Sequence, residues 1–98
     1  MRSRYTAFVR ERADYLLATW HPSTRPDRLD FEPGARWLGL ELRSRAVADA
    51  DHAEVEFVAR VRGPGGAAQR LHERSRFVRE HEGVHDRWYY VDGDQRQR

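Results

Sequence analysis

The sequence predicts an α+β domain in which N-terminal helices pack against an antiparallel β-sheet. In the first twenty residues apolar side chains recur at the three- to four-residue spacing of a helix. From residue 37 onward apolar and polar side chains alternate, which is typical of half-buried strands. The strand-like segments follow one another through short turns, and helices followed by such a meander cover one face of its sheet.

The helical segment is expected within Arg2 to His21. Its apolar residues, which share one helical face, are Tyr5, Phe8, Val9, Ala13, Leu16 and Trp20. The spacing allows a break around Arg10 to Asp14, so the segment forms one or two helices. Pro22 ends it, because the residue before a proline is disfavoured in helical geometry. A loop from Pro26 to Gly34 follows.

Four strands are expected near Trp37 to Ala48, Ala53 to Arg62, Ala68 to Glu80 and Arg87 to Asp92. If "GPGGA", Gly63 to Ala67, is a five-residue hairpin loop, opposite charges meet across the second and third strands. On the outer face this register pairs Glu56 with Arg74 and Glu54 with Arg76. On the inner face it sets Val55 opposite Ser75, Phe57 opposite Glu73 and Ala59 opposite Leu71. The last hairpin aligns Phe77 with Tyr90.

Length and composition indicate a single domain, residues 1–98, and exclude several classes of function. All 18 basic residues are arginines, but acidic residues are interspersed and the net charge is only +2. A nucleic-acid partner is therefore not expected, since such proteins carry a basic patch. The absence of Cys excludes disulfides and thiol chemistry. No long apolar run or signal segment is present, so we expect a cytoplasmic protein without a membrane partner.

Six ordered blocks carry a resemblance to a known family. They are "RSRYTAFV", "YLLATWHPSTRP", "WLGLEL", "VEFVARV", "LHERSRFVRE" and "RWYYVDG". In this order they resemble the middle domain of the bacterial YchJ-like family, which belongs to the nuclear transport factor 2-like superfamily. The resemblance implies a cystatin-like cone, in which a curved four-stranded antiparallel sheet cups the helices and leaves a pocket. The superfamily includes enzymes and non-catalytic modules, so the fold does not choose the function.

The resemblance does not imply a metal or a cofactor for this sequence. Typical YchJ-like proteins carry Cys-rich SEC-C zinc motifs, which this sequence lacks, so it is expected to be a trimmed domain or to start too late. The segment "HEGVH", His81 to His85, matches the H-E-x-x-H pattern of zinc proteases, but that chemistry needs both histidines on one helical face. The resemblance places a hairpin turn there, enlarged by a few residues. We expect a solvated loop, no zinc and no cofactor.

The candidate pocket lies where the helix end meets the inner face of the sheet. Its predicted residues are Trp20, His21, Arg25, Trp37, Phe57, Glu73, Ser75, Phe77, Trp88 and Tyr90. A buried carboxylate is costly unless it is paired or neutralised, so Glu73 needs a partner. On the structural interpretation, Arg25 or His21 bonds to Glu73 or to a nearby carbonyl. On the functional interpretation, Glu73 or His21 acts as a general base with a shifted pKa.

Two functions from different classes remain. The first is a non-catalytic module that binds a small ligand or a protein partner, and the alternative is a small isomerase- or dehydratase-like acid/base enzyme. An open pocket with an unpaired Glu73 favours the enzyme, whereas a filled cone with a salt-bridged Glu73 favours the module. We also expect a homodimer through the outer face, because superfamily relatives often associate there and a small domain gains stability by burying surface. That face carries Glu54, Glu56, Arg60, Arg62, Arg74 and Arg76 beside Val58 and Val78.

Overall fold

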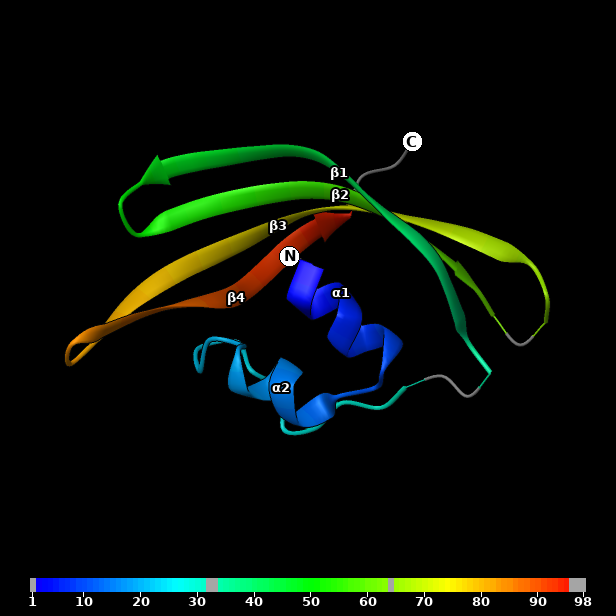
Figure 1. Ribbon diagram of the computed structural model, residues 1–98, viewed down its shortest axis with the longest axis horizontal. Coiled ribbons are helices and arrows are strands. Elements are labelled where there is room, and N and C mark those ends of the chain that lie inside the picture. The colour runs from blue at the N-terminus through cyan, green and yellow to red at the C-terminus, as the bar shows by residue number, and fades with distance from the viewer. Residues whose placement is uncertain (1, 32–33, 64, 96–98) are drawn as a thin grey trace.

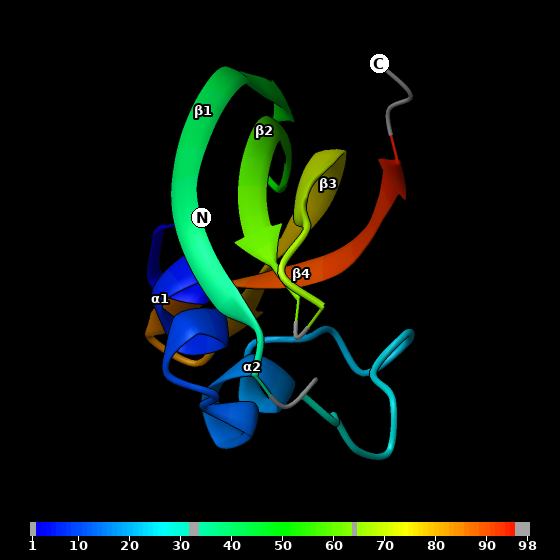
Figure 2. The same cartoon turned by 90° about the vertical axis from the view of Figure 1, so that its right-hand side faces the viewer.

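The computed structural model describes residues 2–31, 34–63 and 65–95. Two helices come first, α1 (Arg2–Val9) and α2 (Ala13–Ala18). Four strands follow, β1 (Arg36–Asp49), β2 (His52–Arg62), β3 (Ala68–Glu82) and β4 (His85–Gln95). They form one antiparallel sheet in the order β1-β2-β3-β4. The sheet curves over the two helices, which lie on its concave side (Figures 1 and 2). The predicted α+β fold is confirmed.

The helical segment is divided in two at the predicted break. Glu11 adopts a left-handed backbone conformation with φ 54°, which ends the first helix and reverses the chain. The second helix then folds back against the first, and the Tyr15 hydroxyl donates a hydrogen bond to Ser3 Oγ at 2.9 Å. Leu16 of α2 is fully buried.

The register between β2 and β3 is the predicted one. Glu56 lies opposite Arg74, Glu54 opposite Arg76 and Phe57 opposite Glu73. Phe77 also lies opposite Tyr90, as predicted. The segment "HEGVH" is exposed and forms a hairpin turn, as expected, but the turn is not enlarged, because β3 and β4 continue to Glu82 and His85 around a two-residue turn in which Gly83 has φ 63°. The two histidines are thus held on neighbouring strands.

Strand β1 departs from simple alternation through bulges at Leu38 and Arg43. An unbroken alternation would place Trp37 on the opposite face from Leu42. In the structure both face the helices, because the extra residue at Leu38 reverses the alternation between them. The Trp37 ring packs edge-on against Tyr5, with ring centroids 5.7 Å apart, and Leu42 lines a cavity on the same face.

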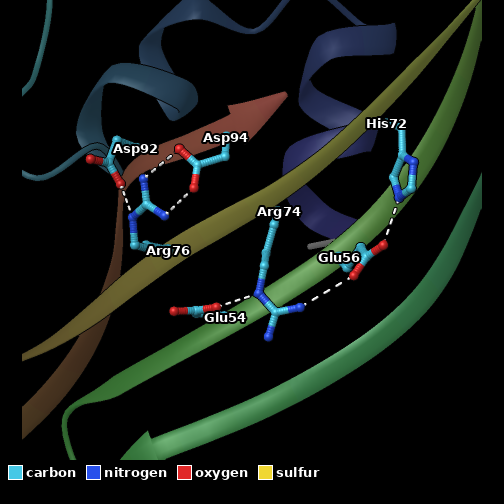
Figure 3. A network of polar contacts seen from close by, with 7 residues as sticks. All are labelled: Glu54, Glu56, His72, Arg74, Arg76, Asp92 and Asp94. Carbon is cyan, nitrogen blue, oxygen red and sulfur yellow. Dashed lines mark hydrogen bonds and ion pairs between the residues drawn. The ribbon is translucent and has the colours of Figure 1, made fainter. Parts of the chain in front are cut away.

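The outer face of the sheet carries a network of charges that pair with one another (Figure 3). Its members are Glu54, Glu56, His72, Arg74, Arg76, Asp92 and Asp94. Arg74 bridges Glu54 and Glu56 along β2. Arg76 contacts Asp92 at 2.6 Å and Asp94 at 2.9 Å on β4. The outer-face charges therefore connect β2, β3 and β4.

Neither of the described helices is long and apolar enough to cross a membrane.

His81 joins the far ends of the two hairpins. Its Nε2 lies 2.9 Å from Asp51 Oδ1 in the turn after β1, and its Nδ1 lies 2.7 Å from Asp86 Oδ1 on β4. The hydrogen bonds to Asp86 and then to Asp51 raise the pKa of His81 above its ordinary value of 6.5. The protonated imidazole is the form that can donate to both carboxylates.

We expect His81→Gln to change how stability depends on pH. Because the folded pKa is raised, the stabilisation from protonated His81 is fully present below the unfolded pKa of about 6.5 and is lost as pH rises through the folded value. The difference in unfolding free energy between wild type and His81→Gln should therefore be largest near pH 5.5 and shrink toward pH 8.5. Urea unfolding across this range measures it. His85→Gln is the matched control, and a difference for His81→Gln that stays constant with pH would contradict the prediction.

Candidate functional site

An open cavity of about 800 Å³ lies between the helices and the concave face of the sheet. Its lining residues are Ser3, Arg4, Tyr15, Thr19, Leu42, Arg43, Ser44, Arg45, Val47, Ala53, Val55, Phe77, Trp88 and Tyr90. This volume is within the range of small-molecule sites, which are mostly apolar with a few polar groups. The described lining combines apolar and aromatic side chains with three arginines and contains no Asp, Glu or His.

The buried charged residue of this cavity is Arg4 on α1. It is only 6% exposed, and its guanidinium carbon lies 4.3 Å from the centroid of the Tyr90 ring and 5.4 Å from that of Trp20. One guanidinium nitrogen donates a hydrogen bond to Thr19 Oγ1 at 3.1 Å. Burial lowers the pKa of Arg4 from its ordinary value. The guanidinium still stays protonated, as arginines do in proteins.

The remaining donors of Arg4 reach the cavity. No buried side-chain nitrogen or oxygen of the described residues lacks a hydrogen-bond partner, yet Thr19 satisfies only one of the Arg4 nitrogens. The other nitrogens of this guanidinium are therefore accessible to solvent, and Arg4 is a lining residue. Arg4 makes no ion pair within 4 Å in the described part of the chain.

Glu73 is the carboxylate whose charge acts on the Arg4 guanidinium, although Glu73 does not line the cavity. Its negative charge favours the charged form of Arg4. Its own oxygens accept hydrogen bonds from Ser75 Oγ at 2.6 Å, Gln95 Nε2 at 3.1 Å and the Tyr90 hydroxyl at 3.4 Å. Burial and the charge of Glu73 raise the pKa of Tyr90 to about 12, so the phenol is neutral at pH 7.

The predicted pairing of Glu73 with Arg25 or His21 is wrong. The corner that carries them, residues 20–25, lies beside Tyr90, which pairs with Phe77, four residues along β3 from Glu73. Glu73 accepts its hydrogen bonds from Ser75, Gln95 and Tyr90, and the imidazole of His21 contacts Glu80. Arg25 instead donates from Nε to the Trp20 carbonyl at 3.0 Å, the alternative partner that had been expected.

This corner crosses the edge of β4. Trp20 forms a parallel bridge with Tyr90, whose N–H donates to the Thr19 carbonyl and whose carbonyl accepts from the His21 N–H. Side chains of successive extended residues point to opposite faces, so Trp20 packs edge-on against Tyr90 on the inner side. The His21 imidazole lies on the outer side, 2.8 Å from Glu80 Oε2, and faces the ring of Tyr89.

The structure brings some of the predicted pocket residues together and separates others. Phe77, Trp88 and Tyr90 line the cavity. Phe57 and Ser75 are buried in the sheet, and Trp37 packs against α1 instead. The prediction missed the three lining arginines, Arg4, Arg43 and Arg45. For Arg4 a signal was present, because it lies three and four residues before Ala7 and Phe8 and so shares their helical face.

Comparison with known proteins agrees with this architecture. The family model described as the YchJ middle NTF2-like domain matches residues 1–93. The chain belongs to the YchJ family. A UPF0225 protein of Polaromonas naphthalenivorans is 74% identical over 97% of the chain, and the match covers 66% of that relative. A UPF0225 protein of Bordetella pertussis is 58% identical over 96% of the chain and 68% of its own length. The chain thus spans about two thirds of the length of these curated relatives.

Two solved structures share the fold of this YchJ-family chain. The solution structure of a SEC-C motif containing protein from Rhodopseudomonas palustris has a TM-score of 0.81 and 32% identity, and the match covers 99% of this chain and 76% of that one. The crystal structure of a SEC-C motif containing protein from Psychrobacter arcticus has a TM-score of 0.77 and 34% identity, over 94% of this chain and 56% of that one.

Gly93 allows the Glu73 carboxylate to occupy its position. A Cβ at Gly93 would lie 2.7 Å from Glu73 Cδ and 2.9 Å from its Cγ. We expect Gly93→Ala to displace the carboxylate and to lower the free energy of unfolding by about 1–3 kcal/mol. Gly39→Ala in β1 is the matched control, because a Cβ there meets nothing within 4 Å. Urea unfolding measures both variants. In a Glu73→Ala background the cost of Gly93→Ala should fall, and an unchanged cost would refute the contact.

Glu73→Gln tests the electrostatic role of this carboxylate. The substitution keeps the shape of the side chain but removes a negative charge that favours the charged form of Arg4. We expect a loss of about 1–3 kcal/mol at pH 7, because an amide nitrogen replaces one of the oxygens that accept from Ser75, Gln95 and Tyr90, and Arg4 loses a favourable charge. Thermal and urea unfolding measure the loss. Glu41→Gln, an exposed carboxylate on β1, should leave stability within experimental error. Unchanged stability of Glu73→Gln would contradict the assignment.

Proposed function

We propose that this domain is a non-catalytic module that binds a small organic molecule in the cavity between the helices and the sheet. The observation that carries the proposal is the lining itself. It provides aromatic and aliphatic walls and several donors, but no carboxylate or imidazole among its described residues. A binding site needs shape and a few oriented polar groups, and this lining supplies both.

The acid/base enzyme is the weaker alternative. A general base must lie within hydrogen-bond reach of the proton that it removes. Glu73 is outside the lining and already accepts hydrogen bonds from Ser75, Gln95 and Tyr90. His21 is on the outer side of the β4 edge, beside Glu80. Tyr90 lines the cavity, but its raised pKa makes it a poor base near neutral pH.

The cone geometry of the superfamily supports the same function. The sheet curves strongly over the helices (Figure 2), and the cavity lies between them and its concave face. The curvature here is strong near β1, whose bulges turn the strand. In longer relatives this domain is joined to other segments, and a ligand or protein partner bound by the domain would then contribute to the function of the whole protein. A homodimer through the outer face and a cytoplasmic location stay predictions.

A variant in which a larger side chain fills the cavity tests the proposal. Ala53 lines the cavity from β2, so Ala53→Trp should occupy part of it. We expect that, in a ligand-observed NMR screen of neutral and charged fragments, some bind wild type and shift amide signals of cavity residues, and that Ala53→Trp abolishes this binding. Val84→Trp, at a turn residue that is 93% exposed, introduces the same side chain elsewhere and should bind as wild type does.

Amide spectra of both variants establish that the fold is kept. If no fragment shifts the cavity signals of wild type, or if Ala53→Trp binds fragments as well as wild type does, the cavity is not the binding site.

A further inference from the structure

We propose that the ligand of this cavity is a small organic anion, with a carboxylate or phosphate head held by Arg4 and an apolar body against Phe77 and Trp88. The inference rests on the proposed binding function and adds the chemical class of the ligand. It depends on the charge of the lining, on the environment of Arg4 and on the placement of the apolar walls.

The charges that line the cavity are all positive. Arg4 comes from α1, and Arg43 and Arg45 come from β1 on the other side of the opening. Arg43 contacts Glu41 at 3.5 Å, whereas Arg45 makes no ion pair with a described residue. Tyr90 is neutral at pH 7 and does not offset these charges. The potential inside the cavity is therefore positive and attracts an anion.

Arg4 differs from the other arginines whose side chains the structure describes, because it is buried. A guanidinium removed from water is costly unless a counter-charge and further hydrogen bonds compensate it. Thr19 accepts one bond, and the rings of Tyr90 and Trp20 contact the guanidinium. Glu73 supplies a negative charge only from beyond ion-pair distance and is already bonded to other donors. The free guanidinium donors are thus positioned to bind an anionic head, for which their fork geometry is well suited.

The apolar walls of the cavity indicate the chemistry of the rest of the ligand. Phe77 and Trp88 lie on neighbouring strands of the concave face, and Val55 and Leu42 continue the surface across β2 and β1. Trp88 is 42% exposed and Leu42 is 44% exposed, so both have apolar surface left to cover. An inorganic ion would use the arginines and leave this surface in water. An anion with an aromatic or aliphatic body uses both.

Four probes of similar size but different charge test the inference. They are 4-phenylbutyrate, phenyl phosphate, neutral 4-phenylbutyramide and cationic 4-phenylbutylamine, with inorganic phosphate as the anion without an apolar body. Binding is followed by NMR titration of the wild-type chain at low and moderate salt. We expect the tighter organic anion to bind at least about tenfold more tightly than the amide, because the amide oxygen can accept a hydrogen bond but brings no negative charge and no second acceptor oxygen to the guanidinium. The tighter of the two anions identifies the head group.

Substitutions then locate the head group. Arg4→Lys keeps the charge but loses the planar fork, and we expect it to weaken the organic anion by about tenfold. Because Arg4 is buried, its variant could fail to fold, so the exposed Arg45→Gln provides a second measurement with an expected loss of about threefold. Arg60→Gln, on an exposed residue of β2 outside the cavity, is the matched control and should bind as wild type does.

The outcomes separate the two proposals. If the amide or the amine binds at the cavity as tightly as the anions, the anion inference is overturned and the binding function is retained. If inorganic phosphate binds as tightly as the organic anions, the role of the apolar walls is overturned. If no probe and no fragment binds at the cavity, both proposals fail. Unchanged anion affinity in Arg45→Gln and in a folded Arg4→Lys would also overturn the inference.

Discussion

The buried guanidinium of Arg4 is the constraint around which the functional half of the molecule is arranged. It joins α1 to the residue after α2 through Thr19, and to the sheet through the ring of Tyr90. A cation in this position needs negative charge nearby, which Glu73 supplies, and Glu73 in turn needs donors and space. Ser75 provides a donor and Gly93 provides the space. One buried charge thus accounts for a polar cluster on an otherwise apolar face.

The two faces of the sheet place charged side chains in different environments. On the outer face Arg74 and Arg76 contact carboxylates on neighbouring strands, and these pairs, which are partly or fully exposed, are screened by solvent (Figure 3). They help to fix the register but contribute little net stability. On the inner face Arg4 is largely buried, and an uncompensated charge that is mostly removed from water is far more costly. The inner charge, although outnumbered, therefore matters more for the proposed binding site.

Periodicity and charge pairing predicted the sheet well, because both are local or act between adjacent strands. The β2–β3 register followed from Glu56 opposite Arg74. The bulge at Leu38 was not predictable in this way, since alternation carries no mark of an extra residue. The residues of the candidate site were harder to predict from the sequence than the sheet. Arginine is seldom buried, so its residue type gives no reason to place Arg4 in the site. The partner of Glu73 depended on where the corner crosses β4, which the sequence does not specify.

Arg4 also links the binding of a ligand to the stability of the fold. In the free domain the guanidinium is bonded to Thr19 and makes no ion pair with the described part of the chain, although it is largely removed from water. An anion that binds there restores a counter-charge within reach of the guanidinium. It contacts the folded chain but not the unfolded one, so its binding free energy adds to the stability of a small domain. The feature that makes Arg4 costly for folding is therefore the same feature on which the proposed selectivity for anions rests.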